Sequence, residues 1–178
     1  MDKKVIILVA FFCWALHGFS QQIQESYAWD SITKLTWKNF KGAIPLDADA
    51  AATTASGISY KYSANLLHHE VKIDAEVTAF FYPNESWYKP NECDDYILEH
   101  EQLHFDIAEL FARKMRIRLN NTSFSDNVKA EIRNIYNEIL QELSDLQEQY
   151  DLETNFSRNR DAQLSWNAQI FEALEKIN

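Results

Sequence analysis

The stretch His100-Glu101-Gln102-Leu103-His104 reads His-Glu-x-x-His and is the starting point for interpreting the chain. On an α-helix, two histidines four residues apart lie on one face, so both imidazoles can bind one metal ion. Zn²⁺ is the metal that this pairing favours. Glu101 sits about 100° further round the helix, within reach of a water at the metal. The pattern predicts His100 and His104 as zinc ligands and Glu101 as a general base.

The surrounding sequence supports a helix whose apolar face carries both histidines. The stripe at helical spacing consists of Ile97, His100, His104, Ile107, Phe111 and Met115. Buried imidazoles need polar partners, and a metal ion supplies one. The alternative is a pair of core histidines that hydrogen-bond to other side chains and hold no metal.

Three helices are predicted in the second half of the chain. The first spans 92–119, with Asn91 as N-cap and acidic residues in its first turn. The second spans 126–150 with Ser125 as N-cap, and the third spans 160–176. Each carries an apolar stripe with the period of an α-helix.

The first half of the chain is predicted to be rich in β-structure. Short aromatic strands are expected at 27–29 and 35–37, and longer alternating strands at 53–63 and 69–82. Residues 65–68 would connect the longer two as a hairpin. The predicted fold class is α+β, a small antiparallel sheet followed by three packed helices, the first of which carries the His-Glu-x-x-His motif.

Residues 1–20 have the features of a cleavable signal peptide. Lys3 and Lys4 precede an apolar run over 5–16, and Gly18 and Ser20 place small residues before a cut after Ser20. A lipoprotein signal would need small residues before Cys13, and Phe11 and Phe12 stand there instead. The protein is therefore expected to be secreted or periplasmic, with one domain over 21–178.

Charge and cysteine content narrow the range of partners. The chain carries −10, and removing 1–20, with a net +1, would leave −11. Such an acidic protein is a poor binder of nucleic acid or anionic membranes, and no other segment is apolar enough for stable membrane insertion.

After cleavage, Cys93 would be the only cysteine, so an internal disulfide is excluded and a buried thiol is expected. The oligomeric state is not readable from the sequence.

Several separated segments together match one known pattern. They are Leu35-Thr36-Trp37-Lys38-Asn39-Phe40-Lys41-Gly42, Ser86-Trp87, the stretch from His100 to Leu110, Tyr150-Asp151-Leu152-Glu153-Thr154-Asn155, and Gln163-Leu164-Ser165-Trp166. In their order and spacing, the chain resembles the bacterial secreted zinc-dependent protease family, long catalogued as a domain of unknown function. The resemblance implies a zincin-like metalloprotease domain with Zn²⁺ as cofactor and a peptide or protein as substrate.

The resemblance also shows a departure at the position of a candidate third ligand. Family members typically carry a histidine after the Tyr-Asp-x-x-Thr stretch, where this chain has Phe156, and a phenyl ring cannot bind zinc. Asp151 is one replacement, although it can also orient a histidine or cap the turn before Thr154. Other possibilities are no third ligand, a second-helix glutamate, or a histidine of an exposed turn: Glu131, Glu138, Glu142, His68, His69.

Six further side chains are expected to have supporting or structural roles. Glu109 is expected in a supporting or surface position, because it points away from the face that the histidines share. Tyr150 either donates to a developing oxyanion or, as favoured here, completes the apolar stripe of its helix. Large aromatic residues mostly belong to the core, and this is expected of Trp29, Trp37, Trp87 and Trp166.

Two functions from different classes follow. The first is a secreted or periplasmic zinc metallopeptidase, in which an extended peptide pairs with a sheet edge formed by the strand around 71–79. The second is a catalytically silent relative that keeps the fold, with or without a metal, as a binding module. A purely structural zinc is less favoured, since such sites usually have four protein ligands, often cysteines.

The signal-peptide interpretation predicts the N-terminus of the exported protein. N-terminal sequencing of protein recovered from outside the cytoplasm should begin at Gln21. Retention of Met1, or a lipid attached to Cys13, would contradict it.

Overall fold

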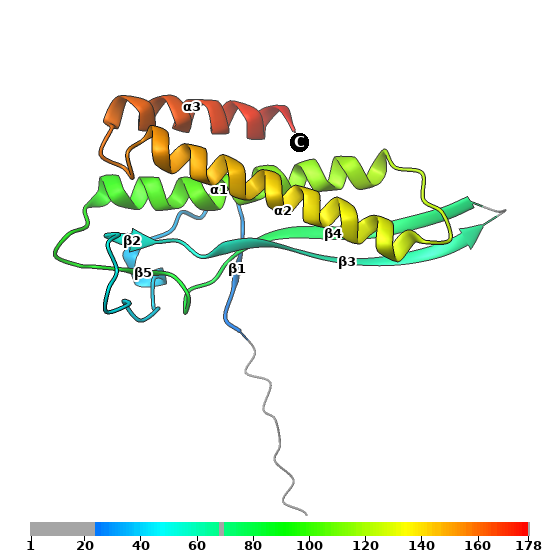
Figure 1. Ribbon diagram of the computed structural model, residues 1–178, viewed down its shortest axis with the longest axis horizontal. Helices are drawn as coiled ribbons and strands as arrows, with labels where there is room; N and C mark the ends of the chain where they lie inside the picture. Colours follow the sequence, from blue (N-terminus) through cyan, green and yellow to red (C-terminus); the bar gives the residue numbers. More distant parts are fainter. Residues whose placement is uncertain (1–23, 68–69, 178) are drawn as a thin grey trace, which may run out of the picture.

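The computed structural model describes residues 24–67 and 70–177, and it has the predicted α+β architecture. Small antiparallel sheets are followed by three packed helices, with α1 lying between the long hairpin and the other two helices (Figure 1). The elements are β1 (Tyr27–Ala28), the 3₁₀ helix η1 (Trp37–Asn39), β2 (Ala52–Thr53), β3 (Ser56–Leu67), β4 (Glu70–Phe81), β5 (Trp87–Tyr88), α1 (Asp95–Asn120), α2 (Val128–Glu153) and α3 (Arg160–Lys176).

The main sheet has the strand order β1-β4-β3, and a second, two-stranded sheet pairs β2 with β5. Ile58 lies opposite Ala79 in the hairpin register, and both side chains are buried beneath the helices. Lys61 lies opposite Glu76 on the other face, where the two form an exposed ion pair of 2.8 Å. The period-two alternation therefore predicted correctly which face of the hairpin is covered.

The sequence misplaced three β-features. The strand expected at 53–63 begins at Ser56, because Thr53 belongs to β2 in the second sheet. Residues 65–67, expected in the connection, continue β3 and pair with 70–72, so the strands extend to the two residues His68 and His69, which lie outside the described residues. The strand expected at 35–37 is absent from the described chain. Trp37 begins η1 there, because Asn39 Oδ1 accepts the Thr36 N–H at 2.7 Å and closes a tight turn.

The helices were predicted with errors only at their ends. α1 begins at Asp95, because the Asp94 carboxylate rather than Asn91 accepts an N–H of the first turn, that of Ile97 at 2.9 Å. α2 begins at Val128, so Ser125 lies before its N-cap, and it extends three residues further than expected. α3 matches its prediction. Within the described part of the chain, no helix combines the length and the apolar character needed to cross a membrane.

The burial of individual side chains contradicts the predictions for Glu109 and Cys93 and partly confirms the prediction for the tryptophans. Glu109 is buried, with only 5% of its surface exposed, and its carboxylate accepts from Arg113 and Arg116 inside the protein. The Cys93 thiol is only partly buried, and it contacts the carbonyl of Ala51. Trp87 and Trp166 belong to the core, while Trp29 and Trp37 pack against it half-buried.

Gly42 lies where the loop after η1 approaches the turn before β5. Its N–H donates to the Ser86 carbonyl at 2.8 Å, and a Cβ at this position would lie 2.9 Å from the same oxygen. The Asn84 carbonyl oxygen would lie 3.0 Å from the same Cβ, and because both oxygens belong to the backbone, neither can move without moving the turn.

We expect Gly42→Ala to lower the free energy of unfolding by about 1–3 kcal/mol, the usual cost of overpacking. Gly57→Ala is the matched control, because a Cβ there meets only the Tyr82 ring at an ordinary 3.5 Å. Urea unfolding monitored by circular dichroism measures both. Equal stability of the two variants would contradict the crowding at Gly42.

Candidate metal centre

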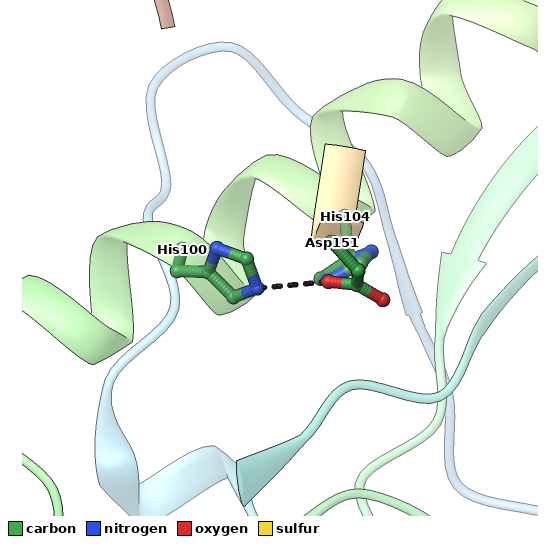
Figure 2. Close-up of side chains that lie close together, drawn as sticks. All are labelled: His100, His104 and Asp151. Carbon is green, nitrogen blue, oxygen red and sulfur yellow. Dashed lines mark hydrogen bonds and ion pairs between the residues drawn. The ribbon is translucent and has the colours of Figure 1, made fainter. Parts of the chain in front are cut away.

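Two helices bring three potential ligands together. α1 supplies His100 and His104, and the last turn of α2 supplies Asp151. The Nε2 atoms of both histidines lie 3.1 Å from the same carboxylate oxygen, Oδ1 of Asp151. Figure 2 shows both rings beside the carboxylate, with the His100 ring pointing at it. All three ligand atoms lie within 4.8 Å of one another.

This arrangement fits a metal ion in chemistry and in dimensions. Zinc binds histidine and carboxylate ligands through bonds of about 2.0–2.1 Å, which in a tetrahedral site places donor atoms about 3.3 Å apart. The two contacts of 3.1 Å are close to that spacing. Two imidazoles and one carboxylate are also a ligand set that catalytic zinc sites use. His100, His104 and Asp151 thus form a group suited to holding a metal ion.

Electrostatics keeps the shared carboxylate charged. Burial opposes ionisation of Asp151, but its contacts with the His100 and His104 imidazoles outweigh burial and hold the pKa of this carboxyl well below its usual range. Burial likewise opposes protonation of His104, yet Asp151 and Glu101 together raise its pKa. The Asp151 carboxylate therefore stays negatively charged in a partly desolvated place, where a cation close by, either a protonated His104 or a metal ion, stabilises it.

The three second-helix glutamates lie away from the histidine pair, while His68 and His69 are outside the described residues. Glu131 bonds to Ser125, and Glu138 and Glu142 both face Arg118. Phe156 sits at the rim of the cavity beside the histidines, with 54% of its surface exposed. Among the described residues, Asp151 is the one that completes the pair of histidines.

Glu101 lies in the same cavity as the ligand group. Its side chain is 5% exposed, and Oε2 has no hydrogen-bond partner among the described residues. The Thr54 hydroxyl bonds its backbone carbonyl instead, at 3.1 Å. A buried carboxylate oxygen without a partner is costly unless a ligand or a proton transfer uses it. The position suits the proton acceptor that the motif predicts.

The cavity has a volume of about 780 Å³ and three walls. Residues of α1 and α2 form one wall, residues 49–54 with β2 form the second, and the turn 156–158 forms the third. The strand beside the site is therefore β2 and not the 71–79 segment expected from the sequence. β4 is the middle strand of its sheet and, among the described residues, contributes nothing to the lining.

The turn after α2 forms its wall with an unusual backbone. Asn155, Phe156 and Ser157 have φ values of 48°, 50° and 69°, the left-handed region that side chains other than glycine rarely adopt. The Phe156 N–H donates to the Asp151 carbonyl at 2.8 Å, which fixes the turn to the ligand-bearing end of α2. Strain of this kind concentrates at functional sites, where the surrounding structure maintains it.

Tyr150 supports the centre from behind. Its ring stacks on His100 with centroids 4.5 Å apart, and its one hydroxyl proton is shared between Gln163 Oε1 at 2.7 Å and, more weakly, the His100 carbonyl at 3.2 Å. The side chain is fully buried, and burial raises the pKa of its hydroxyl far above the usual value. These contacts agree with the packing role favoured from the sequence.

Gln163 is a residue of the site that sequence reasoning missed. It lies on α3, it is fully buried, and its Oε1 is 2.9 Å from His100 Nδ1. A signal was present in the sequence, since Gln163 stands three residues before Trp166 on the apolar stripe of α3. A glutamine on such a stripe indicates a buried amide that needs polar partners.

Residues 83–158 match the model of a family described as "Bacterial protein of unknown function (DUF922)". The match covers less than half of the chain; it includes all three potential ligands and Glu101 and ends before Gln163. No curated protein and no solved structure matches the chain. The family description assigns no activity, so the resemblance to zinc-dependent proteases stays a prediction.

The geometry predicts that each chain binds one divalent metal ion through His100, His104 and Asp151. We expect His104→Ala and Asp151→Ala each to remove the metal, because two remaining ligands hold zinc poorly. Elemental analysis after dialysis measures the stoichiometry. Asp145→Asn is the control, since Asp145 is an exposed acid on the same helix, bonded to Gln141.

The variant Phe156→His tests whether Asp151 is the third ligand. A histidine at the cavity rim should leave zinc affinity unchanged if Asp151 is already the third ligand. Unchanged metal content in Asp151→Ala, or a large gain in affinity from Phe156→His, would show that Asp151 does not complete the site.

Proposed function

We propose that the protein is a secreted or periplasmic zinc-dependent metallopeptidase with Glu101 as its general base. The observation that carries this proposal is the shared cavity. It holds the three-ligand group and, beside it, a buried Glu101 carboxylate whose Oε2 has no partner among the described residues. A purely structural metal would not need such an acid next to it.

The number of ligands favours a catalytic metal over a structural one. Structural zinc usually has four protein ligands, whereas catalytic zinc has three and keeps a position open towards the substrate. The group here offers three, and it borders a cavity large enough for a short peptide segment. When bound, zinc supplies Lewis-acid polarisation of a carbonyl and lowers the pKa of a coordinated water.

The chain's own residues supply the remaining steps. Glu101 would accept the proton of the attacking water and then deliver it to the leaving amine, so its side chain must reach the cavity without another partner. His100, His104 and Asp151 would hold the metal in place. The stacked ring of Tyr150 would keep His100 in its orientation.

The substrate would bind as an extended peptide along β2. β5 pairs with β2 on one side, and the described residues provide no strand on its other side. Residues 49–54 line the cavity, so an added strand would pass directly over the ligand group. Backbone hydrogen bonds to a strand edge bind peptides with little regard to their sequence. The proposed substrate class is therefore unfolded or flexible peptide.

Export is part of the proposal and rests on the sequence of residues 1–20, which lie outside the described residues. The partly exposed single thiol at Cys93 agrees with a chain that forms no internal disulfide after cleavage. The acidic charge of the chain agrees with a protein that binds no nucleic acid.

One observation favours the alternative, a catalytically silent metal-binding module. The proton of the Tyr150 hydroxyl is already shared between Gln163 and the His100 carbonyl, so it is not free to stabilise an oxyanion. Other side-chain donors line the cavity, among them the hydroxyls of Thr53 and Ser157 and the exposed Arg158 guanidinium. Turnover measurements separate the two functions.

We expect Glu101→Gln to lower the hydrolysis rate by about 10²–10⁴ while zinc stays bound, because glutamine keeps the shape but cannot accept a proton. Glu99→Gln, an exposed acid two residues earlier on α1, is the matched control. A fluorogenic peptide library and a labelled unfolded protein serve as substrates, with zinc content measured in parallel. Zinc-loaded wild-type protein that cleaves neither substrate would overturn the peptidase and leave the binding module.

A further inference from the structure

We propose that Gln163 is a positioning residue that sets the tautomer of His100, so that the Nε2 lone pair of this histidine faces the metal position. The proposal rests on the metal-binding part of the proposed function and does not require peptide hydrolysis. It assigns to α3, which lies beyond the sequence stretch matched by the family model, a direct role in the centre.

The orientation of the Gln163 amide follows from its partners. Its Nε2 donates to Asn167 Oδ1 at 2.8 Å, one helical turn further along α3. Its Oε1 accepts the Tyr150 hydroxyl at 2.7 Å and faces His100 Nδ1 at 2.9 Å. A carbonyl oxygen only accepts hydrogen bonds, so the proton of this contact belongs to His100 Nδ1.

The other nitrogen of the ring then becomes the metal ligand. Neutral imidazole carries one N–H, so a proton on Nδ1 leaves a lone pair on Nε2. That lone pair faces Asp151 Oδ1 at 3.1 Å, which is itself an acceptor. Two acceptors at this distance repel one another unless a metal ion or a second proton lies between them. The Gln163 contact thus prepares His100 and Asp151 for a shared cation.

His104 differs from His100 in this respect. Its Nε2 lies 3.1 Å from the same oxygen of Asp151, and among the described residues no hydrogen-bond partner holds its Nδ1. It can therefore donate to Asp151 through Nε2–H and change tautomer when a metal arrives. The tautomer of His100 is therefore fixed before a metal binds, whereas the tautomer of His104 changes when the metal binds.

The surrounding fold holds Gln163 firmly enough for this role. The side chain is fully buried, and Asn159 caps the first turn of α3 by accepting the Ala162 N–H at 3.2 Å. The Trp166 indole N–H donates to Glu153 at 2.9 Å and ties α3 to the end of α2, two residues beyond Asp151. The amide cannot turn away without breaking contacts to three side chains.

The first test measures zinc affinity by competition with a chromophoric chelator. Gln163→Met keeps the length of the side chain but removes the acceptor, and we expect affinity to fall about 10–100-fold, as for other residues that orient metal ligands. Gln163→Glu restores an acceptor and should return affinity to within a few fold of wild type. Gln169→Met changes an exposed glutamine of the same helix and should have no effect.

The second test reads the tautomer itself by ¹H–¹⁵N NMR of ¹⁵N-histidine-labelled protein in mildly alkaline buffer. His100 should carry its proton on Nδ1 in wild-type protein with and without zinc, and an Nε2–H form should appear in metal-free Gln163→Met. Far-UV circular dichroism checks folding. Should Gln163→Met be unfolded, Asn167→Ala releases the amide without touching His100 and should give the same change to a smaller extent.

A wild-type His100 that lacks a proton on Nδ1 would overturn the proposal. So would a folded Gln163→Met protein with unchanged tautomer and zinc affinity. Protein that cleaves no peptide yet shows the expected tautomers and affinities would refute the peptidase and leave the role of Gln163 intact. Protein that binds no zinc would refute the metal centre, while the metal-free spectra would still decide the tautomer.

Discussion

The single carboxylate oxygen of Asp151 that faces two imidazoles is the constraint on which the arrangement of the helices depends. His100 and His104 come from the middle of the chain, and Asp151 comes from the last turn of α2, a helix that begins at Val128. A charge in a half-buried place must have partners close by, or burial costs more than packing returns. The end of α2 is therefore held against the first half of α1, and the turn that follows must begin at that point.

The backbone of this turn is a consequence of the same constraint. α2 ends beside the metal centre, yet α3 must return immediately to cover Tyr150 and His100. Three successive residues in the left-handed region achieve this reversal without a glycine. The Thr154 hydroxyl and the Asn159 N–H satisfy the backbone carbonyls left open, at 2.7 Å each. The position of Asp151 at the site thus also determines the conformation of the turn that connects α2 to α3.

The sequence predicted well those features that depend on local periodicity. The alternation along the hairpin and the stripe around Ile107 depend on spacing within one segment, and such patterns survive folding because each segment must bury its own apolar face. A short segment gives a weaker pattern, and the prediction for 35–37 was wrong. Leu35 to Trp37 alternates like a strand, but the Thr36 and Asn39 side chains offer the backbone a local turn, and the turn forms instead.

The site was predicted only as far as one helix reaches. His100, Glu101 and His104 are neighbours in sequence, so their geometry follows from helical spacing. Asp151 and Gln163 reach them because of how α2 and α3 cross α1, which no single segment encodes. The strand beside the cavity was misassigned for the same reason: hydrophobic alternation identifies a half-buried strand and says nothing about which strand lies next to which helix end.

The two central residues of the His-Glu-x-x-His motif show how one helix serves two tasks. Gln102 points away from the metal centre, accepts the Leu35 N–H at 2.8 Å and donates to Asp106 at 2.8 Å. Asp106 also accepts the Trp29 indole N–H at 2.8 Å, so the N-terminal segment is fastened to the rear of α1.

This polar anchor resists rotation of α1, and rotation is the motion that would carry both histidines away from Asp151. Leu103, the other of the two residues, is buried in the hydrophobic core. The residues that the His-Glu-x-x-His pattern leaves unspecified therefore fix the angle at which its two histidines face Asp151.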